Sequence, residues 1–373
     1  MYADGARFLA PRLRSKPPPV GTGRGVPEAP NEIDTPVMEA GHLTDAAPTA
    51  MRGRLEERLR QSPALASSLI LIAIFIALVI GEGLHDVLQT TVNGLSLGAI
   101  YALGAVGLTL VYGILKLTNF AHGDFLTFGA YMAYLVNVTW GAPLVVAVFW
   151  AMAATALLGL LFERTLWGPM RRRRAGFLQL ILMSIGLAFL LRAVIQWFWG
   201  TEIRSLDVDN TSSVEFLGLR VGETELIVIV VGIVVIAAVG LMLRYSLLGK
   251  RMRALSDDLD LAETSGIDTK RVILYTWIFS GALAGLAGVM AAATTNIRPE
   301  LGFELLLPIF AAVILGGIGD AFGALAAGMV LGVMTEWSTL LIDARWKVAV
   351  GFVVLVVVLI IRPQGIFGKA KAI

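Results

Sequence analysis

Ten apolar segments, most of them about the length needed to cross a lipid bilayer, follow one another along most of the chain. They lie at 66–81, 91–114, 120–138, 143–163, 177–199, 225–243, 272–294, 303–318, 321–341 and 346–361. A helix that spans the hydrocarbon core needs about 20 predominantly apolar residues. The chain is 57% hydrophobic and only 16% charged, whereas soluble domains have about 25% charged residues. The sequence therefore excludes a soluble globular domain and predicts an all-α polytopic membrane protein. Because four segments are short or carry polar residues, we expect eight to ten transmembrane helices, with ten favoured.

Basic residues gather in four places, which ten crossings would bring to the same side of the membrane. These are Arg52, Arg54, Arg58 and Arg60; Arg164 and Arg171 to Arg174; Arg244, Lys250, Arg251, Arg253, Lys270 and Arg271; and Arg362, Lys369 and Lys371. Cytoplasmic loops carry an excess of Lys and Arg, so this side is the cytoplasm. The loop 200–224 is mainly acidic and falls outside. The pattern predicts that both termini are cytoplasmic.

Residues 1–62 differ in composition from the rest of the chain. Residues 1–50 are rich in Pro, Gly and small polar residues without an apolar period, and such a composition buries too little apolar surface to offset the entropy of ordering. Met51 opens a basic amphipathic stretch. We expect 1–62 to be either a disordered tail with a basic amphipathic end or, as far as residue 50, a stretch upstream of a true translation start at Met51. The membrane domain is expected at 63–369.

Two polar interruptions mark candidate positions for a translocation pathway. Asn119, His122 and Asp124 lie where helical apolar sequence is expected, and a Gly-rich stretch at Leu315–Gly323 ends near Asp320. Polar groups at membrane depth persist where they are buried in protein or line a cavity. An ordinary cytoplasmic turn with Asn and Asp as helix caps explains the first interruption equally well. Paired interruptions in two halves are typical of inverted repeats, which we therefore expect here.

Two charged residues inside predicted spans are candidates for buried charges. Arg192 is in the fifth segment and Glu336 is in the ninth, at similar depth and with opposite sign. Intramembrane charges are costly and are normally paired or face water, so we hypothesise an Arg192–Glu336 pair. The alternative for Arg192 is that its side chain reaches to the interface.

The loop 244–271 has the pattern of a short amphipathic helix. Met252, Leu255, Leu259 and Ala262 recur at helical spacing. Ser256 to Asp258 is a candidate helix start, and Gly266 a candidate end. Because its polar face mixes acids with bases, the helix suits a groove in a partner protein better than an anionic bilayer.

Several kinds of chemistry lack the residues they need. The chain has no Cys and only three scattered His, which argues against disulfides and a metal cluster. It has no phosphate-binding G-x-x-x-x-G-K-[ST] motif, so any ATP must be hydrolysed by another subunit. The spans contain no nucleophile–base pair, and no basic stripe indicates nucleic-acid binding.

Several motifs together resemble a known family. They are Asn93-Gly-Leu-Ser-Leu-Gly-Ala-Ile-Tyr-Ala-Leu103, Val111-Tyr-Gly-Ile114, Asn119-Phe-Ala-His-Gly-Asp124, Gly129-Ala-Tyr131, the loop Gly249 to Gly266, Leu315-Gly-Gly-Ile-Gly319 and Arg362-Pro-Gln-Gly-Ile-Phe-Gly368. This set is similar to the branched-chain amino acid permeases of ABC importers, and most similar to the "H" half of that heterodimeric permease. The likeness covers roughly residues 85–369.

The resemblance implies a type II-like ABC importer permease of the cytoplasmic membrane that is not itself an enzyme. Its expected partners are a second homologous permease subunit, two cytoplasmic ATPase subunits that bind the ATP, an extracytoplasmic binding protein that delivers Leu, Ile or Val, and membrane lipid. The resemblance also implies that the loop is the segment that couples to the ATPases. The coupling candidates are Gly249, Arg253, Ala254, Asp258, Ala262 and Gly266. The pathway candidates are Asn93, Asn119, His122, Asp124, Arg192 and Glu336.

Other functions remain open at this stage. The same family includes permeases for urea, short amides and other amino acids, although Phe120 and Asp124 fit the amino acid branch better. An ion-coupled secondary transporter would need a membrane-embedded carboxylate, for which only Glu336 qualifies clearly. A scaffold or a membrane enzyme is the least favoured alternative.

Overall fold

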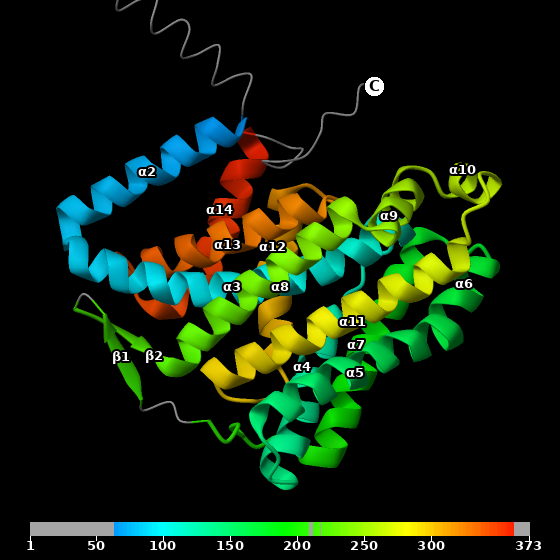
Figure 1. The fold of residues 1–373 in the computed structure, drawn as a ribbon, viewed down its shortest axis with the longest axis horizontal. Coiled ribbons are helices and arrows are strands. Elements are labelled where there is room, and N and C mark those ends of the chain that lie inside the picture. Colours follow the sequence, from blue (N-terminus) through cyan, green and yellow to red (C-terminus); the bar gives the residue numbers. More distant parts are fainter. Residues whose placement is uncertain (1–62, 209–211, 217, 362–373) are drawn as a thin grey trace, which may run out of the picture. The chain divides into compact units, whose positions relative to one another are not determined.

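The computed structural model describes residues 63–208, 212–216 and 218–361. The predicted tail 1–62 and the motif Arg362–Gly368 lie outside the described residues. Within them, each of the ten predicted apolar segments forms a helix (Figure 1). The first five are α2 (Pro63–Glu82), α3 (Leu84–Leu115), α4 (His122–Tyr134), α5 (Leu144–Phe162) and α7 (Phe177–Trp199). The second five are α8 (Glu223–Tyr245), α11 (Thr269–Thr294), α12 (Leu301–Gly316), α13 (Ala321–Trp337) and α14 (Lys347–Ile361).

Shorter elements connect these helices. They are π-helical turns at Leu135–Thr139 and Glu163–Trp167, α6 (Gly168–Arg172), α9 (Leu247–Asp257), α10 (Leu259–Thr264), and 3-10 turns at Ser338–Leu340 and Ala344–Trp346. The acidic loop contains an antiparallel hairpin of β1 (Ser213–Phe216) and β2 (Leu219–Gly222), which the sequence did not predict. The all-α membrane fold is otherwise confirmed. In the described part of the chain six helices are long and apolar enough to cross a membrane, so the exact number of crossings stays a prediction.

The bundle of residues 63–361 has two ends, which are distinguished by the contacts that their loops make. At the end we call the basic end, Lys116 contacts α9 and Gly113 lies near the α12–α13 turn. At the opposite, acidic end, hydrogen bonds join the loops around the hairpin. These join Gln89 to Arg220, Asn137 to Asp207, and Arg204 to Ile297. In Figure 1, α9 and α10 lie at one end of α11 and the hairpin lies near the other. The arrangement agrees with the charge pattern of the predicted loops.

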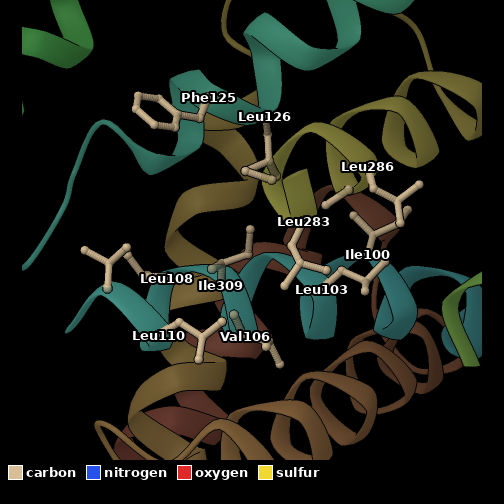
Figure 2. Close-up of a cluster of buried hydrophobic side chains, with 14 of the residues drawn as sticks. Ile100, Leu103, Val106, Leu108, Leu110, Phe125, Leu126, Leu283, Leu286 and Ile309 are labelled. Atoms are coloured by element: carbon tan, nitrogen blue, oxygen red, sulfur yellow. The ribbon is translucent and has the colours of Figure 1, made fainter. Parts of the chain in front are cut away.

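The longest helix, α3, is the core of the bundle. Its side chains meet those of α11 and α12, as Leu103, Leu283 and Ile309 do in Figure 2. Small residues let α13 approach closely: a Cβ added at Gly332 would lie 2.2 Å from the Cα of Gly98. Between helices in lipid, such backbone contact replaces the hydrophobic effect as the source of stability.

Two links of equal length lead into helices that meet in the bundle, α4 and α12. The link 116–121 joins the end of α3 to the start of α4, and the link 295–300 joins the end of α11 to the start of α12. The starts of α4 and α12 meet at Gly123 and Gly302, where a Cβ on Gly123 would lie 2.4 Å from the carbonyl oxygen of Gly302. The Gly302 N–H donates to Thr127 Oγ1 at 2.9 Å.

The inverted repeat expected from the two interruptions stays a prediction. In length the link 116–121 is matched by 295–300 and not by Leu315–Gly323. The latter contains a plain turn between α12 and α13, in which Gly317 and Gly319 adopt positive φ. There Asp320 caps α13 by accepting from the N–H groups of Phe322 and Gly323.

We expect Gly332→Leu to destabilise the chain strongly, because the new side chain would collide with α3 backbone atoms that cannot move independently. Overpacking of this kind costs about 1–3 kcal/mol and at times more. The measurement is the thermal midpoint of the purified chain in detergent. Gly186→Leu in α7 is the matched control, since no atom lies within 4 Å of the added Cβ. Equal midpoints for the two variants would contradict the packing argument.

Candidate functional site

The link 116–121 returns the chain from the basic end into the middle of the bundle without forming helix. Lys116 ends α3 in the left-handed conformation (φ 52°), and Leu117, Asn119 and Ala121 are buried. The link ends at His122, whose Nε2 lies 2.9 Å from the carbonyl oxygen of Gly104. Because a helix rises 1.5 Å per residue, Gly104 lies about 16 Å along α3 from its end at Leu115. Non-helical backbone at such depth is tolerated where protein surrounds it. The first interruption is therefore a buried segment and not an exposed turn.

Side chains satisfy part of the polar backbone of this link. Ser184 on α7 accepts the N–H of Phe120 at 3.2 Å and lies 3.3 Å from the carbonyl oxygen of Thr118, to which its hydroxyl can donate. Asn119 Oδ1 accepts from the N–H of Ala121 at 3.2 Å. Since a carbonyl can only accept, His122 carries its proton on Nε2. Asn119 Nδ2 and His122 Nδ1 are buried without a hydrogen-bond partner among the described residues.

One ion pair lies at the start of α4. Arg192 Nε on α7 lies 3.3 Å from Asp124 Oδ1, and the two side chains are 16% and 1% exposed. The guanidinium also lies 4.8 Å from the ring centre of Phe303 and 5.9 Å from that of Phe189. Asp124 Oδ2 has no partner among the described residues. Charges at membrane depth are costly even when paired, so this pair is a functional candidate.

The hypothesis of an Arg192–Glu336 pair was wrong. Glu336 Oε1 instead lies 2.5 Å from Lys347 Nζ at the start of α14, and Arg192 pairs with Asp124. Similar depth does not make two residues neighbours: α7 packs on α4, whereas α13 packs on α3. Nor does Arg192 reach to the interface, because its guanidinium is held at Asp124.

The six pathway candidates separate into two groups. Asn119, His122, Asp124 and Arg192 surround the start of α4. Asn93 and Glu336 lie toward the acidic end, where Asn93 Oδ1 is 3.4 Å from Gln89 Nε2 and the Cβ of Glu336 lies near Gly94. The structure therefore does not unite all six in one site.

The predicted coupling helix is two short helices, α9 and α10. Asp258 breaks them apart, with φ −154°, and caps α10 by accepting the N–H of Leu261 at 2.9 Å. Met252, Leu255 and Ala262 face the bundle, as the spacing predicted. Leu261 points outward and is 64% exposed.

The candidate coupling residues face in different directions. Gly249 and Ala262 are buried, and a Cβ on Gly249 would lie 2.3 Å from the Leu243 carbonyl oxygen. Ala254 is half-buried, whereas Arg253 is exposed and donates to the carbonyl oxygen of Arg244 at 3.3 Å. Gly266 adopts φ +83° after α10, a conformation that favours glycine. Only the exposed members can contact a partner directly.

The sequence had suggested that acids and bases mix on one face of this segment. In the structure they are separated except for Asp268, which pairs with Arg271 at the start of α11. The acids gather on α10 and its flanks: Asp257, Asp258, Asp260 and Glu263. The bases lie on α9 and at the start of α11: Lys250, Arg251, Arg253, Lys270 and Arg271. The tip of the segment, at α10, is thus acidic, and the part that adjoins the bundle, which we call its base, carries the Lys and Arg residues.

Sequence analysis missed several of these residues. Ser184 and Thr127 are single hydroxyl residues in apolar helices, and nothing in the sequence distinguishes them. Lys347 was missed because Arg345 is the opposite charge nearest to Glu336 in sequence, and only the packing of α14 shows that Lys347 is the partner. Leu261 was hidden because the helical spacing was followed only along the buried face.

The described helices, six of which are long and apolar enough to cross a membrane, define a multi-pass membrane protein. The family model described as "Branched-chain amino acid transport system / permease component" matches residues 90–359. The chain belongs to this family.

Curated relatives agree with this assignment. The chain is 31% identical over 298 residues to the high-affinity branched-chain amino acid transport system permease protein LivH of Escherichia coli (strain K12), covering 76% of this chain and 96% of the relative. It is 30% identical over 304 residues to the corresponding protein BraD of Pseudomonas aeruginosa, and the aligned region covers 77% of this chain and 98% of BraD. It is 26% identical over 315 residues to LivM of E. coli (strain K12), covering 75% and 71%.

We expect Arg192→Gln to destabilise the chain by about 3 kcal/mol, because it leaves the buried Asp124 carboxylate unpaired. Asp124→Asn should cost less, since Arg192 is the more exposed partner. The exchanged variant D124R/R192D should recover most of the loss. Denaturation of the purified chain measures these differences. As a control, R192E/E336R should recover nothing, and recovery there would contradict the observed pairing.

Proposed function

We propose that this chain is the membrane-spanning permease subunit of an ATP-driven ABC importer that moves Leu, Ile and Val across the cytoplasmic membrane. The match of residues 90–359 to the permease family carries the proposal. The names of LivH and BraD support the substrate class. The chain serves translocation and performs no reaction on its cargo.

The start of α4 is the part of the proposed pathway that discriminates among solutes. Asp124, Arg192, Asn119 and His122 bring charge and unpaired polar atoms to the middle of the bundle. Phe303 and Phe189 lie beside the guanidinium, so polar and apolar groups adjoin there. Asn93 and Glu336 lie at the acidic end, where the cargo enters.

The partners follow from what the chain lacks. Its sequence has no phosphate-binding loop, so two cytoplasmic ATPase subunits bind and hydrolyse the ATP. A second homologous permease completes the membrane unit, as the likeness to LivM suggests. An extracytoplasmic binding protein delivers the cargo to the acidic end. The ATPases contact the acidic tip of α10 through Leu261, which is large, apolar and exposed.

Movement of α9 would reach the pathway through short contacts. Lys116 Nζ donates to the Ser256 carbonyl oxygen on α9 at 3.1 Å, and Lys116 begins the link that leads to α4. The start of α4 contacts α12 at Gly302. The link before α12 contains Ile297, which exchanges two backbone hydrogen bonds with Arg204 at the acidic end. ATP-driven displacement of the coupling segment would therefore alter both ends of the bundle.

Reconstitution in vesicles tests the proposal. The chain assembled with its partner permease, the ATPases and the binding protein should accumulate branched-chain amino acids when ATP is present. The chain alone should accumulate none. Uphill transport by the chain alone, driven by a proton or Na⁺ gradient, would disprove the proposal, and transport of urea in place of amino acids would disprove its substrate class.

We expect Leu261→Glu to uncouple ATP hydrolysis from uptake without destabilising the chain. Burying a Leu side chain contributes about 1.5–3 kcal/mol, so docking should weaken about tenfold to a hundredfold. The measurement is cargo-stimulated ATP turnover together with the thermal midpoint.

Two variants control this experiment. Leu261→Met should keep coupling, because volume-conserving apolar exchanges are tolerated. Ala262→Arg should lower the midpoint itself, since Ala262 is buried against the bundle. Normal coupling in Leu261→Glu would exclude this contact.

A further inference from the structure

A cavity of about 300 Å³ lies at the basic end between α9 and the start of α11. Arg251 lines it from α9, and Arg271 and Tyr275 line it from α11. The loop after α10 contributes Gly266 and Asp268. A Cβ at Gly266 would meet no atom within 4 Å, so this side of the cavity is open. Leu261, the residue proposed to contact the ATPases, lies on α10 and is not part of the cavity lining, whereas the coupling candidate Gly266 is.

The lining favours an anion. None of the ion pairs among the described residues includes Arg251. Arg271 uses Nε for Asp268, whose Oδ2 lies 3.0 Å away, which leaves the two terminal nitrogens of its guanidinium for another acceptor. Two guanidiniums against one carboxylate give the cavity a net positive charge. Guanidinium groups bind phosphate through two parallel N–H donors.

The position of the cavity indicates where that anion comes from. Tyr275, one turn into α11 from Arg271, is 48% exposed. The neighbouring α8 ends in an exposed Leu241 followed by Arg244 and Tyr245, with the guanidinium of Arg244 over the ring of Tyr245 at 5.5 Å. Aromatic and basic residues gather at the level of the lipid headgroups. The cavity therefore opens where the phosphates of the cytoplasmic leaflet lie.

We propose that this cavity binds the phosphate headgroup of an anionic phospholipid. The lipid bridges Arg251 on α9 to Arg271 on α11 and so fixes the base of the coupling segment against the bundle. Leu248 and Val272 also line the cavity and supply apolar contact for the glycerol end of the lipid, which a free phosphate ion does not have. The acidic tip on α10 is repelled by the same anionic surface, which keeps it available to a protein partner.

Native mass spectrometry of the full chain tests the proposal, with phosphatidylglycerol and phosphatidylcholine offered in turn. The chain should retain phosphatidylglycerol preferentially. Each of Arg251→Gln and Arg271→Gln should weaken retention about fivefold, and the double variant about 25-fold, from the usual contribution of one basic side chain near an anionic leaflet. Arg251→Lys with Arg271→Lys should retain most of the binding.

The control is Lys250→Gln, which removes an equal charge from α9 outside the cavity and should leave retention unchanged. An equal loss in this control would indicate general surface attraction and overturn the proposal. Displacement of the lipid by a large excess of inorganic phosphate would assign the cavity to a soluble anion instead, and it would also overturn the proposal. If the double variant does not fold, the thermal midpoint of the unmodified chain is measured instead. The midpoint should be higher in phosphatidylglycerol vesicles than in phosphatidylcholine vesicles, and equal midpoints would refute the lipid site.

Discussion

A stretch of backbone that cannot form helix at membrane depth must be enclosed by protein, and the bundle is arranged to enclose the link 116–121. Hydroxyl and carbonyl groups from α7 and α3 bond to its ends. The long α3 passes beside it, and α11, α12 and α13 pack closely around α3. This close packing requires glycines such as Gly98 and Gly332, because a side chain at either position would overlap backbone of the facing helix.

The same constraint explains why the two halves meet as they do. In each half a link returns the chain into the bundle, and each link ends at a helix whose second residue is glycine, Gly123 or Gly302. Two helix starts carry partial positive charge and would repel one another if they met directly. Here Thr127 accepts the Gly302 N–H, and Asp124 places a carboxylate in the first turn of α4. The ion pair with Arg192 thus belongs to the same junction that joins the halves.

The sequence predicted the ten helices because each segment is mainly apolar and bounded by charge or glycine, although four of them are short or carry polar residues. It singled out Asp124, Arg192 and Glu336 because polar and charged groups at membrane depth are costly unless they are paired, buried in protein or facing water. It could not predict their partners, which depend on which helices are neighbours. The link 295–300 escaped notice because Thr, Asn, Arg and Pro there resemble an ordinary loop, whereas the glycines of Leu315–Gly323 attracted attention to a simple turn. Asp258 was read as part of a helix start, which it is for α10, but the sequence did not predict that it divides the amphipathic segment into α9 and α10.

The separation of charge at the coupling segment gives one structure two distinct tasks. The Lys and Arg residues at the base of the segment stabilise the position of the segment at an anionic leaflet, because each of them is attracted to the lipid phosphates. An acidic tip loses energy at the same surface and is directed toward the cytoplasm. If acids and bases alternated along both helices, the two effects would cancel and the segment would have no preferred orientation. Since Asp258 both caps α10 and breaks the helix between the two charge groups, a single residue sets the boundary between the part proposed to face lipid and the part proposed to receive force from a partner.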